Sequence, residues 1–148
     1  MQQTHLCRSE KEMIDFAAGL ARTLQGGEVF ALVGNLGCGK TIFVKGLALG
    51  LQSSAVVTSP TFNLVHRYAG KELMLIHYDL YRLKEFKEIE ALDLETALQE
   101  KNVIAIEWPQ LVEPILPSQQ TRWIRFQEVN NFSRVVIVSD QKLNDKVA

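Results

Sequence analysis

Between residues 9 and 24 the chain carries apolar residues at helical spacing, with polar residues between them. The apolar positions of this stripe are Met13, Phe16, Ala17, Leu20, Ala21 and Leu24. Spacing of this kind predicts an amphipathic helix. Ser9 followed three residues later by Glu12 is typical of the capping box at a helix start, and Gly26-Gly27 is a stop signal. We therefore expect a helix that begins after Ser9 and ends before Gly26.

Three other segments are almost continuously apolar. They are residues 29–33, 73–78 and 103–106, and the second and third run directly into an acidic residue, Asp79 and Glu107. Short runs of this kind are typical of strands that are buried on both faces of a parallel sheet. We expect these three segments to form the centre of such a sheet.

The segments between the strands have helical or extended character. Residues 41–52 are expected to form a helix, and residues 84–100 have helical composition in two short pieces that break near Asp93. Short extended pieces are expected at residues 56–57 and 61–68. Strands that alternate with helices predict an α/β sandwich with parallel central strands.

The C-terminal part follows a different pattern. Residues 123–127 and 135–138 flank Asn130-Asn131, and two strand-like runs around such a turn predict an antiparallel hairpin. The whole chain has 148 residues, which is enough for one domain with a real core and too few for two.

Composition and charge narrow the range of partners and compartments. Lys plus Arg number 16 and Asp plus Glu 17, which gives a net charge of −1 and disfavours tight binding of nucleic acid by this chain alone. No apolar run could serve as a secretory signal or cross a membrane. Cys7 and Cys38 match no metal-ligand spacing. A cytoplasmic protein with no membrane association is expected.

The strand at residues 29–33 runs into Gly-Asn-Leu-Gly-Cys-Gly-Lys-Thr at residues 34–41, which has the G-x-x-x-x-G-K-T spacing of a phosphate-binding loop. Glycines let successive backbone N–H groups point into one concavity, and the next helix adds its positive end. The predicted nucleotide-binding residues are Gly37, Cys38, Gly39, Lys40, Thr41 and Ile42. Lys40 should reach the β- and γ-phosphates, and the Thr41 hydroxyl should bind Mg²⁺. Cys38 is read as a free position of the pattern.

The loop completes the fold prediction. We expect one P-loop nucleotide-binding domain over residues 1–148, with the fold class α/β: a P-loop NTPase-like three-layer sandwich that has central parallel strands and an antiparallel C-terminal hairpin. The expected ligands are ATP and Mg²⁺. No Asn-Lys-x-Asp guanine motif is present, which disfavours GTP.

Mg²⁺ needs a further oxygen ligand from the protein, directly or through water. Asp79 and Glu107 both follow buried strands of the kind expected beside the loop strand, and ligands in such sheets collect at strand carboxyl ends. The residues alone leave open which of the two acids contacts the metal. Lys40, Asp79 and Glu107 are the candidate catalytic residues.

Four motifs in order resemble the bacterial TsaE (YjeE) ATPases. They are the loop at residues 34–41, Thr-Ser-Pro-Thr-Phe at 58–62, His-Tyr-Asp-Leu-Tyr-Arg-Leu at 77–83, and Glu-Trp-Pro at 107–109. The one departure is Cys38, where the family commonly has alanine.

The resemblance implies an ATPase that works with a TsaB–TsaD-type complex in threonylcarbamoyladenosine modification of tRNA beside the anticodon. Such a chain would meet tRNA only through that complex and would turn over ATP slowly without it. Glu107 is similar to the family's magnesium-site glutamate, so Thr41 and Glu107 become the metal ligands, and Asp79 is left to orient water or contact the metal through water. By analogy, the adenine would lie between Ser9-Glu10 and Arg134.

A small-molecule kinase could use the same phosphate loop. Such enzymes usually have a lid with several arginines, whereas the arginines here are scattered along the sequence. A scaffold gated by nucleotide, without useful hydrolysis, is a further alternative.

Overall fold

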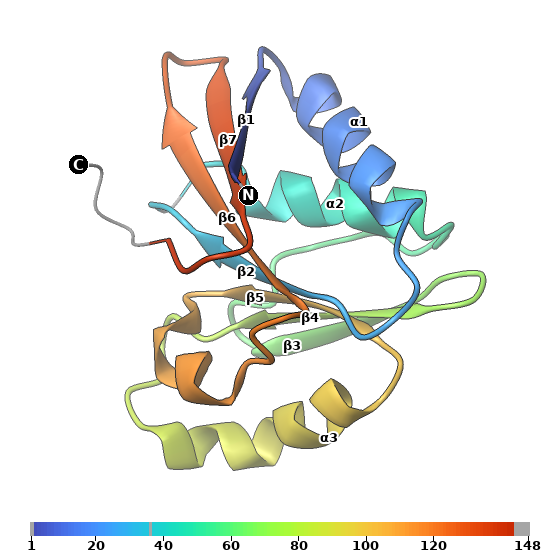
Figure 1. The fold of residues 1–148 in the computed structure, drawn as a ribbon, viewed down its shortest axis with the longest axis vertical. Helices are drawn as coiled ribbons and strands as arrows, with labels where there is room; N and C mark the ends of the chain where they lie inside the picture. Colours follow the sequence, from blue (N-terminus) through green and yellow to red (C-terminus); the bar gives the residue numbers. More distant parts are fainter. Residues whose placement is uncertain (1, 36, 144–148) are drawn as a thin grey trace.

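The computed structural model describes residues 2–35 and 37–143. Across these residues seven strands form one sheet in the order β1-β7-β6-β2-β5-β4-β3 (Figure 1). The strands are β1 (Gln2–Cys7), β2 (Val29–Val33), β3 (Val65–Ala69), β4 (Met74–Asp79), β5 (Val103–Glu107), β6 (Thr121–Glu128) and β7 (Arg134–Ser139). The four central strands β6, β2, β5 and β4 run parallel, and the pairs at both edges are antiparallel.

Helices cover both faces of the sheet and make three layers (Figure 1). Helices α1 (Glu10–Ala21) and α2 (Lys40–Gly50) pack on one face over a core that contains Phe30, Leu32 and Ile124. The 3-10 segments η1 (Phe86–Leu92) and η2 (Pro109–Ile115), together with the short helix α3 (Leu94–Gln99), cover the other face. No helix in the described part of the chain is long and apolar enough to span a bilayer.

The fold confirms the predicted class and most of the predicted elements. The three apolar runs form β2, β4 and β5, and the C-terminal hairpin is β6–β7. The helical region at residues 84–100 breaks at Asp93, whose φ of 54° is left-handed. Ser9 caps α1 by accepting a hydrogen bond from the Glu12 N–H at 3.1 Å, while the Glu12 carboxylate accepts from the Arg8 N–H instead of that of Ser9.

Three local predictions were wrong or incomplete. Residues 56–57 form no strand, and residues 61–63 form a turn, so β3 begins only at Val65. Strand β1 was not predicted because five of its six residues are exposed and carry no apolar pattern. Segment η2 was also not predicted, because its two prolines indicated a loop.

Close contact between α1 and α2 depends on two glycines of α2. A Cβ atom on Gly46 would lie 2.5 Å from the Ile14 carbonyl oxygen and 2.6 Å from the Ala17 Cβ. A Cβ on Gly50 would lie 2.4 Å from the Ala18 carbonyl oxygen. At these two glycines the backbone of α2 therefore lies directly against α1, with no space for a side chain.

Substitution of Gly46 with alanine should destabilise the protein by about 1–3 kcal/mol, because the added methyl group has no space unless the helices separate. Gly19→Ala is the matched control, since a Cβ at this helical position meets nothing within 4 Å and should stabilise by about 0.5–1 kcal/mol. Urea unfolding of both variants measures the difference. Equal effects of the two substitutions would contradict this account of the packing.

Candidate nucleotide site

The glycine-rich loop joins β2 to α2 at the carboxyl edge of the parallel strands. Gly34, Gly37 and Gly39 have φ values of 148°, 75° and 108°, which side chains disfavour. Gly39 is the N-cap residue of α2 and provides no capping side chain. The first turn of α2 therefore has N–H groups without a side-chain acceptor, as an anion-binding helix start requires. Leu36 lies outside the described residues.

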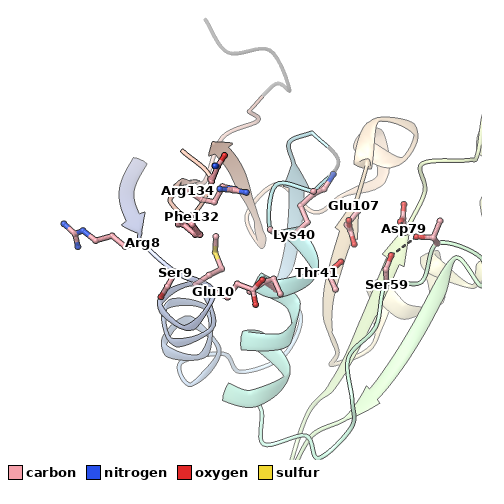
Figure 2. A pocket seen from close by; sticks show the side chains of 16 residues that line it. Arg8, Ser9, Glu10, Lys40, Thr41, Ser59, Asp79, Glu107, Phe132 and Arg134 are labelled. Atoms are coloured by element: carbon pink, nitrogen blue, oxygen red, sulfur yellow. Dashed lines mark hydrogen bonds between the residues drawn. The ribbon is translucent and has the colours of Figure 1, made fainter. Parts of the chain in front are cut away.

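The loop forms one wall of a pocket of about 680 Å³ (Figure 2). The other walls come from the start of α1, the loop at residues 59–61, the ends of β4 and β5, and the turn between β6 and β7. The sequence-predicted residues that line it are Gly37, Gly39, Lys40, Thr41, Ile42, Asp79 and Glu107. Five separate segments thus meet at one cavity beside the loop.

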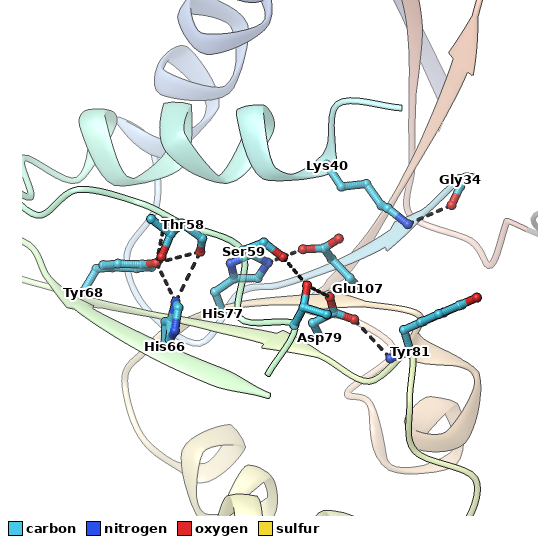
Figure 3. A network of polar contacts seen from close by, with 11 residues as sticks. Gly34, Lys40, Thr58, Ser59, His66, Tyr68, His77, Asp79, Tyr81 and Glu107 are labelled. Carbon is cyan, nitrogen blue, oxygen red and sulfur yellow. Dashed lines mark hydrogen bonds and ion pairs between the residues drawn. The ribbon is translucent and has the colours of Figure 1, made fainter. Parts of the chain in front are cut away.

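Lys40 is 5% exposed, although its charge would ordinarily keep it in water. Its Nζ donates to the Gly34 carbonyl oxygen at 2.8 Å (Figure 3). The same Nζ lies 4.0 Å from the centre of the Trp108 ring. Trp108 itself packs against Tyr81, with ring centres 4.9 Å apart. The ammonium group is therefore held by a carbonyl and an aromatic face, and it has no carboxylate ion pair within the described residues.

The two candidate acids lie side by side at the ends of neighbouring strands. Asp79 and Glu107 are direct partners in the β4–β5 register, and each is about 5–6% exposed. Glu107 is also the register partner of Leu32 in β2, whereas β4 is separated from β2 by β5. The expectation that both acids end strands beside the loop strand was thus correct only for Glu107.

The hydroxyl-bearing loop at residues 58–61 lies against Asp79. The Thr61 hydroxyl donates to Asp79 Oδ2 at 3.5 Å and contacts the Ser59 hydroxyl at 2.7 Å. At the other end of the loop, the Tyr68 hydroxyl donates to the Thr58 carbonyl oxygen at 3.1 Å. Ser59 and Thr61 line the pocket, so this loop connects the pocket to strand β3.

Cys38 differs from the other predicted nucleotide-binding residues. Its N–H donates to the Asn35 carbonyl oxygen at 3.2 Å, and its side chain is buried away from the pocket lining. Burial raises the pKa of the Cys38 thiol, which outweighs the favourable effect of Lys40. The thiol is therefore a packing group, in agreement with its reading as a free position.

Sequence reasoning missed several residues of the pocket. Asn131 and Phe132 line it from the β6–β7 turn, and Met13 lines it from α1. Phe132 is 80% exposed, and a large apolar residue in an otherwise polar turn was the one available signal. The segments expected to hold the adenine do face this cavity, because Ser9, Glu10 and Arg134 are part of its lining (Figure 2).

No group of three or more His, Cys, Asp or Glu side chains within residues 2–35 and 37–143 is arranged to hold a metal ion. Magnesium in nucleotide sites usually takes only one or two protein ligands and completes its shell with phosphate oxygens and water. The Thr41 hydroxyl and the Glu107 carboxylate, which share the pocket, are a donor set of that kind.

Burial raises the pKa of Asp79 above its ordinary value of 3.8, and the nearby Glu107 charge raises it further, although the Tyr81 N–H lowers it. An acid whose pKa is raised in the folded state destabilises the folded protein when it is ionised. This destabilisation is absent below pH 3.8, develops as pH rises, and is complete above the folded-state pKa. Asp79→Asn should therefore raise the melting temperature of the nucleotide-free protein at neutral pH. The gain should shrink as pH is lowered toward the ordinary value, and a gain independent of pH would contradict this explanation.

Fold and site together define the class of protein. A buried parallel strand, a left-handed glycine loop and a helix that starts at a lysine, set in a three-layer α/β sandwich, are the features of a P-loop NTPase-like fold. The comparisons with known proteins give the family within this class.

The family model described as "Threonylcarbamoyl adenosine biosynthesis protein TsaE" matches residues 7–136. The protein with the name tRNA threonylcarbamoyladenosine biosynthesis protein TsaE in Borreliella burgdorferi is 41% identical over 130 residues, which cover 87% of this chain and 93% of that protein. Its namesake in Rickettsia conorii is 34% identical over 146 residues, or 96% of this chain and 81% of that protein. The chain belongs to the TsaE family, and the predicted resemblance to this family is confirmed.

A solved structure agrees with the fold. The crystal structure of YdiB from Bacillus subtilis superposes with a TM-score of 0.78 at 28% identity, covering 93% of this chain and 84% of that one. The arrangement of layers and strands described above is therefore shared with an experimentally determined relative.

Proposed function

We propose that the chain binds ATP with Mg²⁺ in the pocket beside the loop and hydrolyses it in support of threonylcarbamoyladenosine modification of tRNA. The observation that carries this proposal is that Lys40, Thr41, Asp79 and Glu107, from three separate elements, line one cavity. Membership of the TsaE family supports the pathway. We propose that this ATP hydrolysis takes place in the cytoplasm.

The donor groups suit a triphosphate and its metal. The first turn of α2, the Gly37 and Gly39 backbone and the Lys40 ammonium supply positive charge for phosphate oxygens. Thr41 and Glu107 supply the hard oxygen atoms that Mg²⁺ prefers. The metal would neutralise charge on the phosphates. Asp79, whose carboxylate lies one strand further out, is the group that would orient the attacking water.

Lys40 must change partners for this role. Its Nζ donates to the Gly34 carbonyl oxygen and lies over the Trp108 ring, so phosphate would compete with a carbonyl and an aromatic face for the same ammonium. Both are weaker partners than a charged phosphate oxygen. Lys40 thus lies close to the position proposed for phosphate binding, and a bound nucleotide would replace its contacts with Gly34 and Trp108.

Hydrolysis by the chain alone should be slow, because the described contacts of the two pocket arginines, Arg8 and Arg134, are made away from the phosphate loop. The Arg134 Nη1 donates to the carbonyl oxygens of Asn130 and Ser133, and Arg8 pairs with Glu12 at 3.8 Å. Among the described residues, neither guanidinium forms a hydrogen bond or ion pair with the loop. We propose that a TsaB–TsaD-type complex completes the site or closes it, and that tRNA is met only through that complex.

The test is ATP turnover by the purified chain with and without TsaB and TsaD. We expect slow turnover alone and clear stimulation by the pair. Absence of stimulation despite demonstrated complex formation would overturn the partnership and leave the nucleotide site standing. Transfer of the γ-phosphate to a small-molecule acceptor, in stoichiometric amount, would favour the kinase alternative instead.

Trp108 fluorescence should change when ATP binds, because Lys40 leaves the face of the ring. Trp123, in β6, is the other tryptophan of the chain, so a Trp123→Phe variant isolates the Trp108 signal. Titration with Mg-ATP should give a saturable change in this variant, and Trp108→Phe should remove it. A signal that persists without Trp108 would refute this account of the lysine.

A further inference from the structure

His77 is a polar side chain that the proposed function does not use. It lies in β4, is 0% exposed, and its Nε2 is 2.5 Å from the Glu107 Oε2 (Figure 3). Its other ring nitrogen, Nδ1, is buried and has no hydrogen-bond partner among the described residues. Among the described residues, the one hydrogen bond of this buried imidazole is made to a carboxylate of the site, and this placement calls for an explanation.

The strand register explains how the two side chains meet. His77 is paired with Ala105 in the parallel β4–β5 ladder, and Glu107 lies two residues further along β5. Residues two apart in a strand share a face of the sheet. His77 and Glu107 therefore lie diagonally on the face that α2 covers, where neighbouring Leu75 and Ala105 belong to the apolar core.

The contacts also place the ring proton. A carboxylate accepts hydrogen bonds, so the imidazole must donate to Glu107 from Nε2. The hydrogen bond to the Glu107 carboxylate is therefore donated by Nε2.

We propose that His77 is a positioning residue that fixes the orientation of the Glu107 carboxylate for Mg²⁺. By donating to Oε2, it holds one oxygen and leaves Oε1 for the pocket that Glu107 lines. Hydrogen-bonded partners of metal ligands commonly set ligand geometry in this way. The inference rests on the proposed role of Glu107 as a magnesium ligand.

The experiment measures ATP binding by calorimetry, with Mg²⁺ and with EDTA, for wild type, His77→Leu, His77→Gln and His77→Asn. Glutamine can place an amide N–H near the position of Nε2, whereas asparagine reaches only near that of Nδ1. The gain in affinity that Mg²⁺ gives should fall about tenfold or more in the Leu and Asn variants. It should recover in His77→Gln, and affinity in EDTA should stay unchanged in all four proteins.

The outcomes separate this inference from the proposed function. If Mg²⁺ increases the ATP affinity of wild type and of His77→Leu by the same factor, only the inference about His77 is overturned. If Mg²⁺ does not increase the ATP affinity of wild type, both the proposed role of Glu107 as a magnesium ligand and the inference about His77 are overturned. If His77→Leu fails to fold in a thermal scan, the Gln and Asn variants decide, and equal gains in those two refute the positioning role.

A double-mutant cycle provides an independent check. In a Glu107→Gln background the carboxylate is gone, so His77→Leu should cause no further loss of the magnesium gain. An additional loss of the same size as in wild type would show that His77 acts by another route and would overturn the inference.

Discussion

Lys40→Ala should lower the affinity for Mg-ATP about 10- to 100-fold, because a charge-assisted hydrogen bond to phosphate contributes roughly 1.5–3 kcal/mol. Turnover in the presence of the partner complex should fall by roughly 1000-fold, comparable with the loss of other groups that neutralise the transferring phosphate. Calorimetry and a phosphate-release assay measure the two effects. The physical reason is that Lys40 is the one loop side chain whose cation lines the pocket.

Lys45→Ala is the matched control, since Lys45 lies on the same helix but is exposed to solvent. This variant should bind and hydrolyse ATP like wild type. The nucleotide-free Lys40→Ala protein should remain folded, because Lys40 forms no carboxylate ion pair in the described structure and its burial is costly. Unfolding of Lys40→Ala would show that its lost activity reports stability rather than phosphate binding.

Asp79→Asn and Glu107→Gln should separate water orientation from metal binding. Asp79→Asn should lower turnover about 100-fold, as is typical for loss of a group that positions or deprotonates the nucleophile, while Mg-ATP affinity changes by less than about threefold. Glu107→Gln should remove most of the magnesium gain in affinity, a loss of about 100-fold for a direct ligand, since even its partners contribute roughly 10- to 100-fold. Turnover and calorimetry on both variants provide the comparison.

The exposed Glu95 of α3 provides a control for loss of one negative charge. Glu95→Gln should leave both turnover and magnesium gain unchanged. The reverse pattern, in which Asp79→Asn loses the magnesium gain and Glu107→Gln keeps it, would exchange the two assignments. Full activity in both acid variants would favour a nucleotide-gated scaffold over an ATPase.

The central sheet could be predicted because its strands carry their own signal. Residues 29–33 and 103–106 are apolar without interruption, since both of their faces are covered, and this pattern is visible without a partner. Strand β1 is the opposite case. It lies at a sheet edge with most side chains in solvent, so its structure depends on β7 and leaves no periodic trace in its own sequence.

The site was predictable where backbone geometry demands particular residues. Glycines and a lysine at fixed spacing identify the loop, and acids after buried strands identify the sheet edge. The order of strands was not predictable, so the strand patterns alone left Asp79 and Glu107 equivalent, and only the family resemblance favoured Glu107. The structure now distinguishes them, because β5 lies beside β2 and β4 does not. The role of His77 was also hidden, because its contact with Glu107 depends on the β4–β5 register.

The pairing of β1 with β7 has a consequence for the timing of folding. Gln2 pairs with Ser139, so the first strand finds its place only when almost the last described residues are available. Arg8 follows β1 directly and Arg134 begins β7, so the wall of the pocket that they form depends on this pairing. Long-range pairings of this kind close late and slowly. The wall of the pocket that contains Arg8 and Arg134 is therefore expected to be among the last parts of the site to form.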